Sequence, residues 1–391
     1  MNKSQQPHKL LLILISYLAF ISLGLPDGLL GVAWPFMSAG LDVPLDSLGI
    51  LLIAFVAGYL STSTTSGKIL AVMPLGLVLS LSCCVTGMSL LAYALSDYWF
   101  MVIIASFFLG SGGGAIDTSI NVFAASRFSP SVINWLHGFY GIGATTGPFL
   151  MTWLFVRDQE WFQGYVIVGI VQIILGLIFL ATLKYWKVSS ASSGAQTSGS
   201  YMQALRIPLA WISIFIFFLY TGLEFGVGHW IFTILTKSRA FEEETAGLWT
   251  SAYWGSFTVG RIIFGFILAR ITVQKVLTAA FLGLIAGTIL LASDYNHFFT
   301  LTGLGLTGLS CAPIFPCLIS LTPKQFGESQ SANVIGFQIS AAMLGGALLP
   351  GFAGLLTDPF GWEVIPLLYI AEAALLLILY IISSRMSRKL F

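Results

Sequence analysis

The sequence predicts an all-α membrane protein with twelve transmembrane helices in two six-helix halves. Of its 391 residues, 57% are hydrophobic and only 8% are charged. Soluble proteins average about 25% charged residues, so this chain lacks the polar surface that water requires. Two further observations specify the architecture. Apolar runs long enough to span a bilayer recur along the chain, and landmarks of the first half recur in the second at a constant offset.

Twelve apolar runs are long enough to cross the hydrocarbon core of roughly 30 Å, which takes about 20 helical residues. We predict a helix for each run, because backbone groups in lipid are hydrogen-bonded within the segment itself. The first run is followed by further apolar sequence instead of a signal-peptide cleavage site, so it is read as a retained span. The spans cover residues 10–34, 46–66, 69–94, 98–124, 133–156, 163–184, 208–235, 245–268, 274–293, 297–321, 330–356 and 361–384.

Lysine and arginine residues predict the orientation. If the N-terminus is cytoplasmic, thirteen of the seventeen lie on the cytoplasmic side, three lie outside and Arg261 falls within a span. Because cytoplasmic loops are enriched in these residues, both termini are expected on the cytoplasmic side of the cytoplasmic (inner) membrane.

The chain divides near its middle. Residues 188–205 are rich in serine and glycine, as in a flexible linker, and separate residues 1–187 from residues 206–391. Glycines of the two halves coincide at an offset of 198 residues: Gly28 with Gly226, Gly49 with Gly247, Gly110 with Gly308, and Gly138 with Gly336. Two parallel repeats joined by a linker are typical of transporters that rock about a central site at the repeat interface.

The composition argues against other classes of function. The net charge is +1 and no basic run is present, so no nucleic-acid partner is expected. The four cysteines lie in apolar segments without zinc-ligand or redox spacing, so no metal and no other cofactor is expected. Phosphate-loop, H-E-x-x-H and Gly-x-Ser-x-Gly motifs are absent, so the chain is not predicted to be an enzyme. We expect a monomer in the lipid bilayer.

Short motifs narrow the class of transporter; they lie at residues 24–28, 114–121, 220–224, 260–265 and 312–316. With twelve spans, the repeat and the central linker, they resemble the major facilitator superfamily, and within it the fucose permease group. That group includes proton-coupled fucose and glucose/mannose symporters and relatives of sodium-dependent glucose transporters. The resemblance covers nearly the whole chain and implies the major facilitator fold. One position departs from the superfamily pattern: Thr62 stands where the loop motif after the second span usually has an aspartate.

Four acidic residues lie in apolar surroundings: Asp27, Asp117, Glu224 and Glu372. A carboxylate costs about 2.5 kcal/mol or more at the centre of a spanning helix, so acids there are usually functional. Asp27 follows Pro26, which frees a backbone carbonyl and favours a discontinuous helix with polar groups facing a cavity. By resemblance, Asp27 matches the carboxylate that fucose permease uses in proton coupling. The alternative is a hydrated helix cap near the outer surface.

Asp117 and Asn121 are four residues apart and so share one helix face. The glycines of residues 110–114 allow another helix or a ligand to approach that face closely. A carboxylate and an amide one turn apart can hydrogen-bond adjacent hydroxyls of a sugar, so Asn121 is a predicted substrate contact. By resemblance, Asp117 matches a glutamate linked to substrate and proton. Asp27 and Asp117 are therefore predicted to couple transport to H+ (or Na+), although the Asp117 pair could instead clamp two helices.

Further substrate contacts are predicted from the repeat. Glu224 corresponds to Pro26, next to Asp27, at the 198-residue offset. Trp230 is a candidate to stack on the apolar face of a sugar, although aromatic rings also anchor helices at the membrane interface. Asn333 and Gln338 are the polar residues of the eleventh span and are predicted to bind hydroxyls of the solute. Tyr140, which corresponds to Gln338 at the 198-residue offset, is also a predicted substrate contact.

Three basic side chains and one acid complete the candidates. Arg261 lies about two turns from the cytoplasmic face and His137 near the cytoplasmic end of its span, so both are predicted to act in gating or structure. His229 is a candidate either for the site or for the membrane interface. The sequence indicates no role for Glu372.

These features predict a secondary active transporter that moves a small polar solute, a monosaccharide, by proton- or sodium-coupled symport through alternating access. Two alternatives stay open. A cavity rich in aromatic residues, which form 14% of the chain, would suit a proton antiporter that exports amphipathic compounds or metabolites. A receptor or sensor with the same fold would bind a ligand without moving it.

Overall fold

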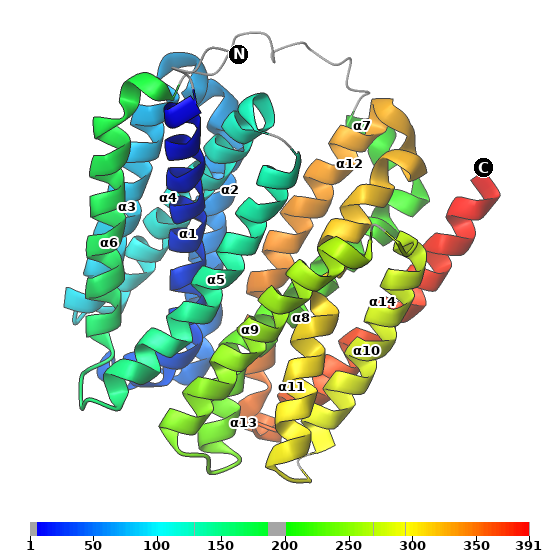
Figure 1. Ribbon diagram of the computed structural model, residues 1–391. Coiled ribbons are helices and arrows are strands. Elements are labelled where there is room, and N and C mark those ends of the chain that lie inside the picture. The colour runs from blue at the N-terminus through cyan, green and yellow to red at the C-terminus, as the bar shows by residue number, and fades with distance from the viewer. Residues whose placement is uncertain (1–5, 129, 187–200, 269, 294, 391) are drawn as a thin grey trace. The chain divides into compact units, whose positions relative to one another are not determined.

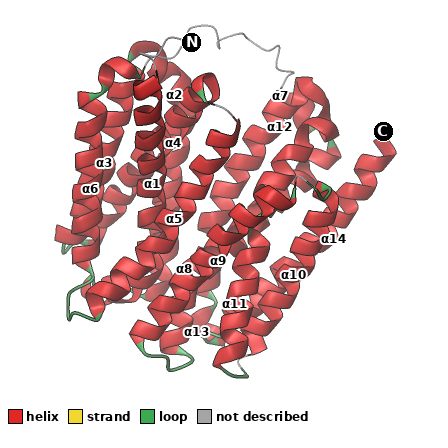
Figure 2. Cartoon of the chain, viewed as in Figure 1, coloured by secondary structure: helices red, strands yellow, loops and turns green. Residues whose placement is uncertain are grey.

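The computed structural model describes residues 6–128, 130–186, 201–268, 270–293 and 295–390, which form helices and short connections without a strand (Figure 1). Figure 2 shows the same all-helical content. The long helices of the first half are α1 (Gln6–Gly40), α2 (Leu48–Val72), α3 (Leu75–Leu95), α4 (Trp99–Arg127), α5 (Pro130–Phe155) and α6 (Phe162–Ala181). Those of the second half are α8 (Pro208–Lys237), α9 (Glu243–Ile267), α10 (Val273–Ser293), α11 (His297–Cys311), α12 (Ile314–Leu355) and α14 (Val364–Leu390).

The predicted all-α membrane fold is confirmed. Ten helical stretches among the described residues are long and apolar enough to cross a membrane. The helices α5 and α9 are not among these ten, but both lie where a span is predicted. Each of the twelve predicted segments thus overlaps a long helix.

The largest difference from the prediction concerns the tenth and eleventh spans. A continuous helix was expected over residues 297–321, but α11 ends at Cys311 and α12 begins at Ile314. Pro313 lies at this break, where its ring removes an N–H and restricts the backbone. The helix α12 then continues into the eleventh span, interrupted by Gly327, whose φ of 71° is a conformation that glycine adopts without strain.

The chain forms two compact units. The first comprises residues 1–193 with 243–251, and the second comprises residues 194–242 with 252–391. The predicted linker, residues 188–205, lies outside the described residues up to position 200. Its last five residues form the short helix α7 (Tyr201–Leu205).

Helix pairing within each unit supports the internal repeat. In the first unit α1 packs on α5 and α2 on α4, and in the second unit α8 packs on α12. A methyl group on Gly110 would collide with the carbonyl oxygen of Phe55, and a methyl group on Gly308 would collide with that of Tyr253. Both the glycines and their partners are 198 residues apart, so the offset found in the sequence is also an offset of contacts.

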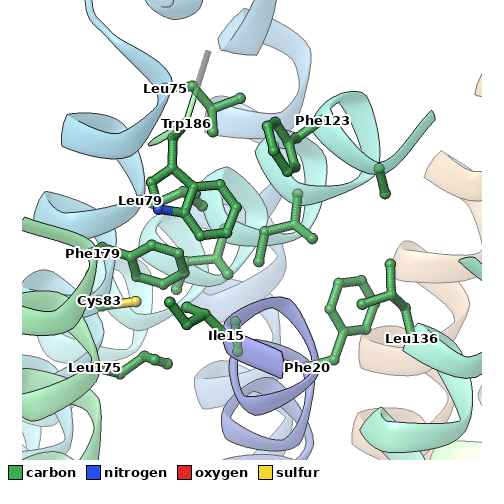
Figure 3. Packing of buried hydrophobic residues seen from close by; sticks show 14 of the residues in the cluster. Ile15, Phe20, Leu75, Leu79, Cys83, Phe123, Leu136, Leu175, Phe179 and Trp186 are labelled. Carbon is green, nitrogen blue, oxygen red and sulfur yellow. The ribbon is translucent and has the colours of Figure 1, made fainter. Parts of the chain in front are cut away.

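A cluster of buried apolar residues fixes the helices of the first unit. Figure 3 shows side chains of α1, α3, α4, α5 and α6 packed together with Trp186, which follows α6. The Trp186 ring lies 4.8 Å from the Phe123 ring and 5.0 Å from the Phe179 ring, measured between centroids. Its indole N–H donates to Thr182 Oγ1 at 2.9 Å.

The same cluster orients α4. Ile116, Ile120 and Phe123 follow helical spacing and are at most 1% exposed. Successive helical residues turn by about 100°, so Asp117 and Asn121 lie on an adjacent face. Burial of the apolar stripe therefore sets where the predicted polar pair points.

Candidate functional site

Asp27 lies on a helix that continues through its proline, so the predicted break in this helix is wrong. The helix α1 is continuous from Gln6 to Gly40, although Pro26 offers no N–H to the carbonyl of Ser22 one turn earlier. Gln172 of α6 supplies the missing donor, since its Nε2 lies 3.0 Å from that carbonyl oxygen. A side chain from another helix thus satisfies the carbonyl, as buried polar groups require.

A tyrosine from α5 holds the Asp27 carboxylate. Tyr140 Oη donates to Asp27 Oδ2 at 2.6 Å. The two helices approach closely because Gly24 lies directly against the Tyr140 carbonyl, where a side chain would collide with the backbone. Gly24 therefore brings the Tyr140 hydroxyl within reach of Asp27, one turn further along α1.

Asp117 is held in the same way from α2. Tyr59 Oη donates to Asp117 Oδ2 at 2.6 Å, and Asn121 Nδ2 donates to Oδ1 at 2.9 Å. Gly114 lies against the carbonyl of Tyr59, where a Cβ atom would collide with it. Asp117 and Asn121 share one face of α4, as predicted, and their side chains are hydrogen-bonded to each other.

The two acids of the first unit therefore share one arrangement. A glycine three residues before each aspartate admits the backbone of a tyrosine, and the hydroxyl of that tyrosine bonds the carboxylate. Tyr59 was not among the residues predicted from sequence. A signal was present, because a tyrosine within an apolar span needs a partner for its hydroxyl.

Thr62, which stands where the superfamily motif usually has an aspartate, bonds a neighbouring helix. Its Oγ1 donates to the carbonyl of Ser111 on α4 at 2.7 Å. The position is thus used for helix packing within the first unit.

In the second unit, Glu224 is buried, with 4% of its surface exposed. Its backbone carbonyl accepts a hydrogen bond of 2.8 Å from Tyr253 Oη of α9. On the same helix as Glu224, Tyr220 Oη donates to the Cys311 carbonyl at 3.0 Å, beside the break between α11 and α12. Tyrosine hydroxyls therefore connect α8 to both α9 and α11 around this acid.

Trp230 and Gln338 lie fully buried within the second unit. The Trp230 indole N–H donates to the Pro350 carbonyl at 2.8 Å. Gln338 Nε2 lies 2.6 Å from Ser213 Oγ and 3.1 Å from Thr322 Oγ1, so it bridges α8 and the first part of α12. Both side chains already have polar partners in this structure, and their predicted contact with a solute stays a prediction.

The remaining candidates are spread over both units. Asn333 Nδ2 lies 3.5 Å from Gln330 Oε1, and the Arg261 guanidinium stacks 4.3 Å from the centroid of the Phe257 ring. His137 is exposed and packs edge-on against Phe20.

Two buried polar groups of the second unit stand out. Among the described residues, no hydrogen-bond partner lies within reach of His229 Nδ1 or Glu372 Oε2. His229 is 1% exposed, and its ring lies 5.8 Å from that of Phe225. Nothing in these contacts gives either residue a role.

Comparison with known sequences covers almost the whole chain. Residues 16–242 and 231–389 match the Major Facilitator Superfamily. The glucose/mannose transporter GlcP of Bacillus subtilis is 24% identical over 351 residues, which cover 87% of this chain and 86% of that protein. Sodium-dependent glucose transporter 1 of Homo sapiens is 22% identical over 383 residues, which cover 88% of this chain and 73% of that protein.

Solved structures share the fold at lower identity. A mutant of the nucleoside transporter NupG superposes with a TM-score of 0.79 at 14% identity, covering 95% of this chain and 99% of that one. The fucose:proton symporter FucP of E. coli superposes with a TM-score of 0.64 at 17% identity, covering 95% and 97%. The relatives and structural neighbours are transporters, not enzymes. The chain therefore belongs to the Major Facilitator Superfamily and is a multi-pass membrane transporter.

Proposed function

We propose that this transporter moves a monosaccharide by proton-coupled symport. The observation that carries the proposal is the pair of carboxylates in apolar helices, Asp27 and Asp117, each bonded to a tyrosine of another helix at 2.6 Å. Acids within membrane-spanning helices are usually functional. The sugar class is supported by the relatives, which include a glucose/mannose transporter and a sodium-dependent glucose transporter.

The bonding chemistry supplies a coupling mechanism. An ionised carboxylate only accepts hydrogen bonds, whereas a protonated carboxyl also donates one. Bonds to a charged group contribute about 1.5–3 kcal/mol, against roughly 1 kcal/mol for neutral pairs. Protonation of Asp27 or Asp117 therefore weakens its tyrosine bond and, with it, the contact between α1 and α5 or between α2 and α4. Proton binding is in this way linked to helix packing.

The same groups suit a sugar. Its hydroxyls can donate to a carboxylate as a tyrosine does, and can accept from the Asn121 amide. A sugar hydroxyl that replaces the Tyr59 hydroxyl at Asp117 would link solute binding to the carboxylate that takes the proton. The further solute contacts proposed are Tyr140, Glu224, Trp230, Asn333 and Gln338.

Transport would proceed by rocking residues 1–187 against residues 206–391, with both termini on the cytoplasmic side of the cytoplasmic membrane. Alternating access of this kind is the usual mode of transporters built from two repeats. The protein would act as a monomer in lipid, with Arg261 and His137 in gating or structural roles.

Counterflow with a panel of labelled monosaccharides in proteoliposomes tests the solute class. One sugar is expected to exchange in the wild type. In Tyr59→Phe, gradient-driven uptake of this sugar should fall about tenfold, the equivalent of about 1.4 kcal/mol. Tyr98→Phe is the matched control, because Tyr98 is 74% exposed, and it should leave uptake unchanged. If no monosaccharide enters under proton or sodium gradients while amphipathic compounds do, the proposal is wrong.

A further inference from the structure

Two small, partly open cavities are formed by residues of the first unit, and both are lined by Pro26 and Asp27. The first, of about 30 Å³, is also lined by Tyr93, Ser106 and Tyr165. The second, of about 20 Å³, is also lined by Ser22, Thr86 and Gln172. Each exceeds the volume of roughly 10–15 Å³ that one water molecule needs.

One lining residue of each cavity has an unsatisfied polar atom. Tyr165 and Gln172 are both 1% exposed. Within the described part of the chain, neither Tyr165 Oη nor Gln172 Oε1 has a hydrogen-bond partner. Buried polar atoms are nearly always bonded to protein or to ordered water. The walls of both cavities are mostly apolar, but each includes several polar side chains that can bond a water molecule.

We propose that the two cavities hold ordered water molecules that bond Tyr165 and Gln172, and that these waters carry a proton to Asp27. The proton step rests on the proposed symport, but the hydration site does not. The hydration site adjoins the face of α4 that carries Asp117 and Asn121, because Gly113, which lines the second cavity, lies one turn before Asp117.

The helix positions of the lining residues show where each cavity lies along the first unit. Tyr165 is the fourth residue of α6, Tyr93 lies two residues before the end of α3, and Ser106 lies in the first third of α4. These positions place the first cavity at the end of the unit where α1 ends and α2 begins. The second cavity is lined by Ser22 and Gln172, nearer the middle of α1 and α6.

The groups around Asp27 can relay a proton. Hydroxyl groups and water molecules both donate and accept hydrogen bonds, so together they can pass a proton from one to the next. A hydronium ion that gives its proton to this chain becomes water, and the Asp27 carboxylate at the other end becomes a carboxylic acid. Titratable neighbours of this acid come from several helices. Tyr140 of α5 bonds it, and Tyr93 of α3 and Tyr165 of α6, whose rings are 5.4 Å apart, line the first cavity with it. The acid of α4, Asp117, is bonded to Tyr59 and lines neither cavity.

Radiolytic hydroxyl labelling of the full-length protein in nanodiscs tests the hydration site without any transport assay. Bound water converts to hydroxyl radical in place, so Tyr165 should be labelled despite its burial. Tyr220, fully buried and bonded to a carbonyl, is the reference. Leu52→Phe, which fills the first cavity, should lower Tyr165 labelling several-fold. Labelling of Tyr165 no higher than that of Tyr220 would overturn the proposal.

Proton uptake into vesicles that carry a pH-sensitive dye tests the relay. Tyr165→Phe should slow solute-dependent proton uptake about tenfold, roughly 1.4 kcal/mol in barrier height, and leave counterflow exchange unchanged. Equal proton uptake in the variant and the wild type would exclude the route. If the wild type moves no proton with any solute, the proposed symport fails and the relay fails with it, while the labelling result still decides the hydration site.

Discussion

Replacing Gln172 with methionine is expected to destabilise the first unit, because it removes the donor that compensates for Pro26. The Ser22 carbonyl has no helical N–H partner at position 26, and Gln172 Nε2 bonds it at 3.0 Å. Ser22 and Gln172 are at most 2% exposed, so bulk water cannot replace the lost donor. Methionine keeps nearly the same volume, so the perturbation is the loss of polar atoms and not a cavity.

The magnitude follows from this burial. An unsatisfied buried carbonyl costs about 1–3 kcal/mol, and we expect Gln172→Met to lower the free energy of unfolding by this amount. Pro26→Ala provides the control, because alanine restores an N–H to the Ser22 carbonyl within α1. In that background the same Gln172 substitution should cost at least about 1 kcal/mol less.

The assay is a double-mutant cycle by denaturant or thermal unfolding of the purified protein in detergent. The four proteins are the wild type, Gln172→Met, Pro26→Ala and the double variant. An interaction free energy near zero, with Gln172→Met equally costly in both backgrounds, would refute the account of how α1 stays continuous through its proline.

Two other predictions concern stability. Burial raises the pKa of Glu363, but hydrogen bonds from Arg239 and its positive charge outweigh burial and hold this pKa below the ordinary 4.5. The wild type should therefore lose stability as the pH falls from about 4.5 through the lower folded pKa, whereas Glu363→Gln should lack this loss. Because Glu363 is 43% exposed, the effect should stay under about 1 kcal/mol. An equal pH dependence of the unfolding free energy in the two proteins would contradict this prediction. Gly110→Ala places a methyl group against the Phe55 carbonyl and should lower the free energy of unfolding by about 1–3 kcal/mol. Gly67→Ala, with open space around it, should be neutral or stabilise the protein by up to about 1 kcal/mol. If the two variants behaved alike in thermal unfolding, the packing argument would be wrong.

The fold was predictable because helices that span lipid need long apolar runs, which can be recognised in the sequence. Apolar runs identified all twelve long helices, and the glycine offset identified equivalent contacts at Gly110 and Gly308. Helix ends were less predictable. The second span was expected to end at residue 66, yet α2 continues to Val72. The polar residues before this end are accommodated within the helix, where hydroxyls such as those of Thr64 and Thr65 donate to carbonyls one turn back.

The site was only partly predictable, because sequence reports a helix face but not the register between helices. Spacing placed Asp117 beside Asn121 correctly, and that bond is seen. The partners Tyr59 and Tyr140 depend on where α2 and α5 contact α4 and α1, which glycine packing determines. Trp230 was selected for its ring, and its indole N–H is bonded within the second unit.

Gradient-driven accumulation in proteoliposomes, comparing the wild type with Asp117→Asn, tests the central claim most directly. With one proton per sugar, a gradient of one pH unit is worth about 1.4 kcal/mol and should drive about tenfold accumulation in the wild type. Asp117→Asn should show no accumulation but retain counterflow exchange. Accumulation in Asp117→Asn equal to that of the wild type, or no sugar accumulation in the wild type, would contradict proton-coupled sugar symport through this carboxylate.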